Sequence, residues 1–330
     1  MAGRGHRGMK LEKISLADID FADESFRISE DLNPDRMAAS LRAVGQLNPA
    51  LLAEAGENPE FRIVCGFRRL HALRSIGGIE ADARVLPCKS GNDLEFLLKA
   101  VWDNLSHRVL EPLETARALV ALKSLGGVEE EVLVRDFLPM FGLSPHRNVL
   151  RSFCSLHRLE PGLRRLMREG HLTLAGAERL ARAPREVQEG VLPVWSRIRL
   201  SASLQREVLE LGEDLAALSG TTLAGILNDP AIQAIAGEAW LSPFQRGEQV
   251  HRYLYRRRNP RIARAREAFL ADKAALQLPG SVRVSPDRFF ETPRLRVEFD
   301  AASPQAFREA AGALERAGRA AALDRLFDIS

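Results

Sequence analysis

Ile63-Val64-Cys65-Gly66-Phe67-Arg68-Arg69-Leu70-His71-Ala72 has the pattern of a strand, a turn and a helix. Its apolar start predicts the end of a buried strand, and Gly66 permits a tight turn. The apolar spacing of residues 70–73 then predicts the start of a helix. Arg68 and Arg69 consequently lie at the positive end of that helix, where backbone N–H groups and guanidinium groups favour an anion. Alternatively, the pair is an ordinary charged turn on the surface.

Segments on both sides of this one have marked patterns of their own. Upstream, residues 32–44 predict a helix that ends at Gly45. Downstream, a strand is predicted around residues 83–86. It is followed by Asp103-Asn104-Leu105-Ser106-His107-Arg108-Val109-Leu110-Glu111-Pro112-Leu113-Glu114-Thr115-Ala116.

Taken in order, these segments resemble four sequence boxes of the ParB family of chromosome and plasmid partition proteins. The boxes are an arginine (Arg27), the pattern G-x-x-x-P-[IL] at residues 45–50, G-E-R-R-x-x-A at 66–72, and E-N-x-x-R-x-x-L-x-P-x-E-x-A at 103–116. Together they cover residues 21–116. The chain is thereby identified as a divergent member of this family.

The resemblance implies an α+β protein of several parts. They are a disordered tail at 1–10, a ParB/sulfiredoxin-like α/β nucleotide-switch domain at 11–116, an all-α helix-turn-helix domain at 117–245, a basic linker or helix at 246–275, and a small ββα dimerisation module at 276–330.

In that family the boxes build a pocket for cytidine triphosphate (CTP) and Mg²⁺, which closes a DNA-loaded dimer into a sliding clamp. The resemblance therefore assigns triphosphate binding to the arginine pair, backbone approach to the first glycine, and the phosphate and metal side to Asn104. The implied nucleotide-binding residues are Arg27, Gly45, Gly66, Arg68, Arg69 and Asn104.

Three positions depart from the family pattern: Phe67 and Asp103 stand where the family has Glu, and His107 stands where it has Arg. Losing the carboxylate at position 67 removes a group that would position Mg²⁺ or water, whereas both arginines of the pair remain. We therefore expect binding of CTP and at most a weak CTPase activity.

The same N-terminal fold includes sulfiredoxin-like phosphotransferases, which have a reactive cysteine. Here Cys65 ends an apolar run and precedes Gly66, which favours a buried structural thiol. An enzyme of this fold, a nuclease or phosphotransferase, remains an alternative, with Glu114, Asp103 and His107 as its acid–base groups.

Composition fits a protein of 330 residues with two or three cores, because 45% of the residues are hydrophobic and 28% are charged. No apolar run approaches membrane-spanning length, and Met1 to Lys10 lacks the hydrophobic segment of a secretory signal. The three scattered cysteines have no metal-ligand spacing and fit a reducing compartment. We expect a cytoplasmic, nucleoid-associated protein with no membrane partner.

Residues 134–156 predict a helix-turn-helix. Val134, Phe137, Leu138 and Phe141 form the apolar stripe of its first helix. Gly142-Leu143 forms the turn, and Ser144 caps a second helix with Pro145 at its first position. The outward side chains are types that read bases or bind phosphates in the major groove. They are Ser144, His146, Arg147, Asn148, Arg151, Ser152 and Ser155. Alternatively, this is an amphipathic hairpin with a solvated basic face.

Charge distribution indicates where DNA would bind, since the net charge is only +3. Residues 144–168 hold six arginines against the single acid Glu160, and residues 251–266 hold seven arginines and no acid. In the second block Arg256, Arg257 and Arg258 are expected to contact DNA phosphates whatever the sequence. A solvated linker is the alternative for that block.

Further helices are predicted at 178–188, 203–218 and 221–227. Trp195 and Trp240 are expected to pack on the core of this all-α part.

The last segment has a strand pattern. Val282 and Val284, then 295–299, alternate with polar neighbours, and Ser303 caps a helix from Pro304 through Leu314. Two strands and one helix are too small to fold alone, so we expect pairing with a second copy. Alternatively, this module packs back onto its own chain.

The sequence thus predicts a sequence-specific DNA-binding partition protein, a dimeric clamp gated by CTP that acts in chromosome or plasmid segregation. Its expected partners are double-stranded DNA, a second copy of itself and a Walker-type partition ATPase. A helix-turn-helix transcription regulator that binds no nucleotide is the main alternative besides the enzyme.

Overall fold

The computed structural model describes residues 11–55, 61–87, 93–287, 292 and 294–327. Contacts divide the chain into two compact units, Met1–Gln188 and Glu189–Ser330. Both are rich in helix, and strands occur at the start of the first and near the end of the second, as a mixed α/β chain requires. The predicted tail at 1–10 and Cys88 lie outside the described residues, and the finer domain boundaries stay a prediction.

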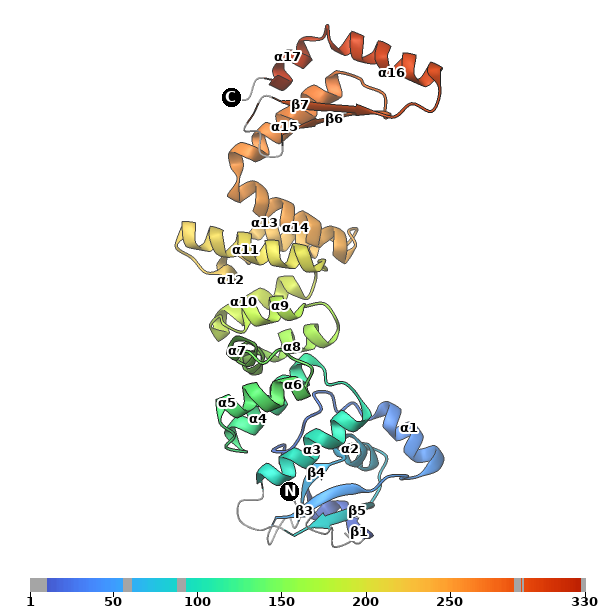
Figure 1. The fold of residues 1–330 in the computed structure, drawn as a ribbon, viewed down its shortest axis with the longest axis vertical. Coiled ribbons are helices and arrows are strands. Elements are labelled where there is room, and N and C mark those ends of the chain that lie inside the picture. The colour runs from blue at the N-terminus through green and yellow to red at the C-terminus, as the bar shows by residue number, and fades with distance from the viewer. Residues whose placement is uncertain (1–10, 56–60, 88–92, 288–291, 293, 328–330) are drawn as a thin grey trace. The chain divides into compact units, whose positions relative to one another are not determined.

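A five-stranded mixed sheet forms the start of the first unit (Figure 1), with the strand order β1-β5-β3-β4-β2. The strands are β1 (Leu11–Ser15), β2 (Ile19–Asp20), β3 (Ala50–Glu54), β4 (Phe61–Cys65) and β5 (Glu80–Leu86). The central strand β3 pairs antiparallel with β4 and parallel with β5. Leu52, Ile63 and Val64 are buried there, which explains the apolar runs of these strands.

Three helices complete this α/β part: α1 (Asp35–Val44), α2 (Phe67–Ser75) and α3 (Asp93–His107). Leu41 of α1 packs against Ala72 of α2, and α3 packs on β4. Gly66 has φ 99°, a left-handed conformation that lets β4 lead straight into α2. The helix begins at Phe67, earlier than predicted, so both arginines lie in its first turn.

The rest of the first unit is helical. It contains α4 (Pro112–Ser124), α5 (Glu130–Val132), a π-helical turn (Leu133–Phe137), α6 (Leu138–Met140), α7 (Arg147–Ser155), a 3₁₀ turn (Leu156–Arg158), α8 (Pro161–Arg168) and α9 (Leu174–Leu180). The predicted apolar stripe is shifted, because the wider π turn buries Leu133 and Leu138 and leaves Val134, Phe137 and Phe141 half-buried.

The predicted start of the second helix of the helix-turn-helix is wrong. α7 begins at Arg147, and His146 is its N-cap without a side-chain capping bond. The N–H of His146 donates to the carbonyl of Ser144 at 2.8 Å, and His146 is extended, with φ −123°. The turn therefore includes Ser144 and Pro145, which cannot belong to the helix.

α10 (Arg185–Trp195) spans the boundary between the units, and the second unit continues with α11 (Ala202–Ser219), α12 (Leu223–Leu227), α13 (Pro230–Gly237) and α14 (Pro243–Arg258). The helix predicted at 203–218 is confirmed as α11, and α12 falls inside the one predicted at 221–227. The helix predicted at 178–188 is wrong. Pro184 separates α9 from α10 because proline has no N–H to donate and disfavours helical geometry before it.

The two tryptophans singled out from the sequence differ in burial. Trp195 is buried in the core as expected, with 1% of its surface exposed, but Trp240 is 75% exposed. In the turn between α13 and α14 it is Leu241 that is buried. The expectation that Trp240 packs on the core is therefore wrong, because its neighbour takes the inward position.

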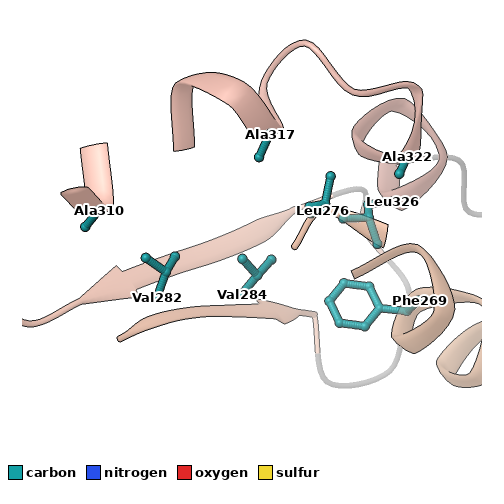
Figure 2. Close-up of a cluster of buried hydrophobic side chains, with 8 residues drawn as sticks. All are labelled: Phe269, Leu276, Val282, Val284, Ala310, Ala317, Ala322 and Leu326. Carbon is teal, nitrogen blue, oxygen red and sulfur yellow. The ribbon is translucent and has the colours of Figure 1, made fainter. Parts of the chain in front are cut away.

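The chain ends with α15 (Pro260–Ala275), the hairpin of β6 (Val282–Pro286) and β7 (Leu295–Phe299), α16 (Pro304–Ala317) and α17 (Ala321–Phe327). The predicted strands and helix are present, and the hydroxyl of Ser303 accepts the N–H of Ala306 at 3.1 Å. Figure 2 shows the core of this module, in which Val282 and Val284 meet side chains of α15, α16 and α17. The chain thus covers these valines itself.

Within the described ranges, no helix is both long enough and apolar enough to cross a membrane.

Candidate nucleotide pocket and nucleic-acid surface

A cavity of about 190 Å³ opens at the positive end of α2. Gly66, Arg68, Arg69 and Asn104 all line it, although Asn104 comes from α3, more than thirty residues later in the chain. Phe67 lines the same cavity as a buried apolar wall. The sequence therefore located four of the residues that meet here.

The two adjacent arginines are held differently. Arg68 has a side chain that is 41% exposed; its Nε donates to the backbone carbonyl of Asp31 at 2.9 Å. Arg69 is more enclosed, and its Nη1 donates to the carbonyl of Pro49 at 3.1 Å. Burial lowers the pKa of the Arg69 guanidinium, and the carboxylate of Asp103 opposes that effect. Neither guanidinium is therefore a free surface charge, although Arg68 is the more exposed of the two.

A second cavity of about 550 Å³ adjoins the first and shares four lining residues with it: Cys65, Arg69, Asp103 and His107. Its other walls include the backbone turn at 48–51, Lys99 and Trp102. The indole of Trp102 is unusual for so large an apolar group, because 57% of the residue is exposed.

Arg108 also lines the first cavity, and sequence reasoning missed it. It forms an ion pair with Glu114 of α4 through both Nη atoms, and its Nη2 lies 2.9 Å from Oδ1 of Asn104. The Glu114 side chain is only 2% exposed and lies 3.7 Å from Nη2 of Arg68. One buried carboxylate thus faces two pocket arginines.

Glu114 is also the N3 residue of a capping box. Its carboxylate accepts the N–H of Glu111 at 3.1 Å and that of Glu30 at 3.2 Å. Burial alone would raise the pKa of Glu114, but the hydrogen bonds from Arg108 and these N–H groups lower it below its usual value. The carboxylate is therefore ionised and fully engaged, which argues against its predicted acid–base role.

Two predicted residues lie apart from these cavities: neither Arg27 nor Gly45 is among the described residues that line them. Gly45 is the C-cap of α1. Arg27 pairs with Glu24, and its Nε is buried without a hydrogen-bond partner among the described atoms. Burial, and next the charge of Arg117, lower the pKa of Arg27. Their role at a nucleotide stays a prediction.

Glu30 joins the α/β part to the helical part of the first unit. Its carboxylate accepts Arg117 of α4 at 3.2 Å and Arg164 of α8 at 2.6 Å. The next residue, Asp31, lies 3.6 Å from Arg168 of α8. Two arginines of the first basic block are therefore paired inside this unit, which leaves fewer charges for DNA than the sequence indicated.

The alternative of a reactive cysteine finds little support. Cys65 is half-buried and lines both cavities, so it is less buried than predicted. Burial raises the pKa of its thiol to about 12, so it is protonated at neutral pH and a poor nucleophile. In the described part of the chain, no group of three or more His, Cys, Asp or Glu is placed to hold a metal ion. Asp103 lines the first cavity next to Asn104. Among the described residues that line this cavity, Asp103 is the only one with a carboxylate.

The predicted DNA-reading residues before and at the start of α7 are on the surface. Arg147, Asn148 and Arg151 are exposed, whereas Ser152 is half-buried. Ser144 and His146 are also exposed. On the other face Leu150, Phe153 and Leu156 are buried and Val149 is half-buried.

The basic end of α14 is less free than the sequence suggested. Arg256, Arg257 and Arg258 each pair with a carboxylate elsewhere in the second unit. The partners are Glu267, Asp229 and Asp214, at 3.1, 2.7 and 3.1 Å. Contact with DNA phosphates would have to displace these pairs.

Several curated proteins are similar to this chain in sequence. The nucleoid occlusion protein of Geobacillus kaustophilus is 28% identical over 158 residues, 48% of this chain and 44% of that protein. The chromosome-partitioning protein Spo0J of Thermus thermophilus is 30% identical over 160 residues, 48% of this chain and 52% of that protein. No protein-family model matches the chain.

Solved structures give weaker similarities. The C-terminally truncated ParB of Caulobacter crescentus complexed with CTP-gamma-S has a TM-score of 0.24 and 23% identity, covering 53% of this chain and 93% of that one. The same protein complexed to the centromeric parS site has a TM-score of 0.32 and 18% identity, covering 68% of this chain and 98% of that one. Both TM-scores are too low to place the parts of this chain.

Proposed function

We propose that this chain, a divergent member of the ParB family, is a DNA-binding partition protein whose N-terminal pocket binds CTP with Mg²⁺. The chain spans about half the length of the curated relatives it matches. The observation that carries the proposal is the meeting of Arg68, Arg69 and Asn104 around one cavity at the positive end of α2.

The phosphate groups would occupy this cavity. Helix N-termini and arginine side chains both favour phosphate oxygens. Gly66 keeps the space open, because a Cβ there would lie 3.3 Å from Cβ of Ala50 and 3.4 Å from Nη1 of Arg69. A side chain at Gly66 would also be strained at its φ of 99°.

The nucleoside would extend into the adjoining cavity of about 550 Å³. The first cavity, at about 190 Å³, is smaller than ligand pockets usually are, roughly 300 Å³ or more. Trp102 offers an exposed aromatic face on which a base can stack, and the exposed Asn48 offers a side-chain amide for its edge.

Mg²⁺ fits the residues present. This ion is usually held by one or two carboxylates together with substrate phosphates, and Asp103 would supply that carboxylate. Asn104, the predicted metal ligand, would first have to release Arg108, because its Oδ1 lies 2.9 Å from Nη2 of Arg108. When bound, the ion would neutralise phosphate charge. Because Phe67 places an apolar ring where the family has a carboxylate, we expect slow hydrolysis at most.

DNA would bind at the exposed start of α7, where arginine and asparagine are types that read guanine and adenine in the major groove. Two copies joined by the C-terminal module would hold two half-sites and form the clamp. The similarity to partition proteins supports a role in chromosome or plasmid segregation on the cytoplasmic nucleoid, with a Walker-type ATPase as partner.

A nucleotide titration tests this function. Calorimetry of the full chain with CTP, UTP and ATP, each with Mg²⁺ and with or without duplex DNA, should show preferred binding of CTP, and CTP should change the tryptophan fluorescence through Trp102. Absence of nucleotide binding in every arm, with saturation at one operator, would favour the transcription regulator instead. Consumption of nucleotide or cleavage of DNA without a partner would favour the enzyme.

A further inference from the structure

The segment between α3 and α4 holds an arginine more firmly than either arginine of α2. The Arg108 guanidinium pairs with both carboxylate oxygens of Glu114, and its Nη2 lies 2.9 Å from Oδ1 of Asn104 and 3.3 Å from Oγ of Ser29. These groups come from α3, α4 and the loop after β2. The orientation of Arg108 is therefore fixed before any ligand arrives.

The hydrogen bonds from Arg108 to described residues involve only its two Nη atoms. A guanidinium has five N–H donors, and no described residue accepts the Nε–H of Arg108. Because 28% of the side chain is exposed and it lines the first cavity, it has donors left for a ligand.

The charge of the cavity points to an anion. Arg68, Arg69 and Arg108 line it, and Glu114 behind them balances only one of these three charges. Asp103 contributes a further carboxylate but is 50% exposed and therefore better screened by water. The remaining positive charge surrounds the positive end of α2.

His107 is a poor source of positive charge for this cavity by comparison. Its side chain is 76% exposed, and its one ion-pair contact among the described residues is Asp103 at 4.0 Å. No contact among the described residues orients the imidazole toward the first cavity, where the phosphates would lie. Arg108, in contrast, is oriented by Glu114, Asn104 and Ser29.

We infer that Arg108 is the third phosphate-binding guanidinium of this pocket, with Glu114 as the residue that positions it. The ligand group is the polyphosphate end of the nucleotide, so the inference rests on the proposed function. It also explains how the pocket keeps a third cation although position 107 is a histidine.

The test compares Arg108→Gln with the parent by calorimetry against CTP, CDP, cytidine and inorganic triphosphate. A charge-assisted hydrogen bond lost from the phosphates should weaken CTP binding about tenfold or more. The loss should be smaller for CDP and absent for cytidine. Arg108→Lys, which keeps a charge beside Glu114 but not the planar fork, should fall between parent and Arg108→Gln.

Controls separate binding from folding. Arg319→Gln removes an arginine whose side chain is 78% exposed and which pairs with Glu315 in the other unit, and it should bind CTP like the parent. His107→Ala should cost less than Arg108→Gln. If Arg108→Gln alone unfolds, the double variant Arg108→Gln/Glu114→Gln removes the unpaired buried charge as well, and it should fold and still bind weakly.

If the parent binds CTP, two outcomes overturn the inference: equal CTP affinity in the folded Arg108 variants and the parent, or a loss that is the same for cytidine as for CTP. If the parent binds inorganic triphosphate in an Arg108-dependent way but not CTP, the proposed nucleotide is wrong and the inference stands. If the parent binds neither, both are wrong.

Discussion

Arg147, at the exposed start of α7, forms an ion pair with Glu131 from α5. Both side chains are more than half exposed, at 58% and 62%. In the proposed DNA complex, the Glu131 carboxylate would therefore compete with DNA phosphate for the Arg147 guanidinium. An acid beside a DNA-binding arginine limits affinity for DNA in general.

Replacing Glu131 by Gln should tighten DNA binding by a factor of about 1.4 to 5 at low salt, because an exposed ion pair is worth roughly 0.2 to 1 kcal/mol. The dependence of affinity on salt should become steeper, since one more cation is available for phosphate. Fluorescence anisotropy with a labelled duplex measures both. Glu129→Gln, the same change at an exposed acid of the same segment, is the control. An equal gain in that control would mean that net charge, rather than the pair, sets the affinity.

Asn148 is the neighbour of Arg147 on the exposed side of α7 and suits bidentate contact with adenine. Asn148→Ala should lower affinity for the preferred sequence by about 1 to 3 kcal/mol and leave affinity for unrelated duplexes unchanged. Competition binding against a pool of duplexes shows this as a loss of preference.

Neutralising Arg256, Arg257 and Arg258 together is the contrasting change. It should weaken all duplexes alike and flatten the salt dependence. The effect should be smaller than three free arginines would give, because each is already paired with a carboxylate.

The Asn148→Ala variant has its own contradicting outcome. A uniform loss of affinity across all duplexes in that variant would mean that α7 does not read bases.

Arg68→Ala is a cleaner test of the nucleotide pocket than Arg69→Ala. Both should abolish or strongly weaken CTP binding, because each removes a guanidinium from the first cavity. Arg69→Ala should lower the melting temperature more, since it strands the carbonyl of the half-buried Pro49, whereas the carbonyl that Arg68 contacts belongs to the exposed Asp31, where water can replace the guanidinium. Calorimetry and thermal melting of the two variants separate the effects. Parent-like CTP binding in Arg68→Ala would contradict the pocket.

Glu114 should make the fold sensitive to acid. Burial works against its charge, yet the hydrogen bonds from Arg108 and two backbone N–H groups hold the pKa of Glu114 below its usual value. A lowered pKa in the folded state contributes stability above the ordinary carboxyl pKa, and that stability is lost as pH falls through the folded value.

Glu114→Gln should therefore be less stable than the parent at pH 7, because Arg108 loses its counter-ion. The gap should narrow as the pH falls below about 4.5. Denaturant unfolding at several pH values measures it. A gap of constant size from pH 7 down to pH 3 would show that the charge of Glu114 does not stabilise the fold.

Local pattern was enough to find the strand, turn and helix around Gly66, because an apolar run followed by a glycine is compatible with few other structures. The φ of 99° at Gly66 agrees with the predicted tight turn. It was also enough for α11 and for the hairpin at the chain end. It failed at Pro184, where the predicted helix is broken, and at the cap of α7, where Ser144 belongs to the turn.

The pocket could be predicted only in part. Arg68, Arg69 and Asn104 lie in recognisable boxes, whereas the role of Arg108 depends on a carboxylate that only the fold brings beside it. The charge of the basic blocks was overestimated for the same reason. Arg164 is paired with Glu30, 134 residues away in sequence, which no local pattern reveals.

The C-terminal module presents apolar groups that its own core does not cover. Val284 is buried, but Val297, its register partner on β7, is 46% exposed, and Phe307 of α16 is 55% exposed. Because paired residues of adjacent strands lie on the same face, the exposed Val297 is on the face of the hairpin that carries the buried Val284. A second copy of the module is the simplest cover for it, since an isologous contact buries the same patch twice.

Val297→Asp should shift the full chain from dimer to monomer, because it places a charge in the proposed contact. It should also weaken binding to DNA with two half-sites more than to a single half-site, since the linkage between the two contacts is lost. Val44→Asp, the same change at an exposed valine of α1, should leave assembly unchanged. Sedimentation velocity at micromolar concentration measures assembly.

Removing the module tests the same idea, and the structure fixes where to cut. Phe269 of α15 and Leu276, which directly follows that helix, belong to the module's core (Figure 2), so deletion of 280–330 would expose them and favour aggregation. The cut belongs after Asn259, at the start of α15. The shortened chain should be a monomer with weaker DNA binding. A full-length chain that is already monomeric at micromolar concentration would exclude both the dimer and the clamp.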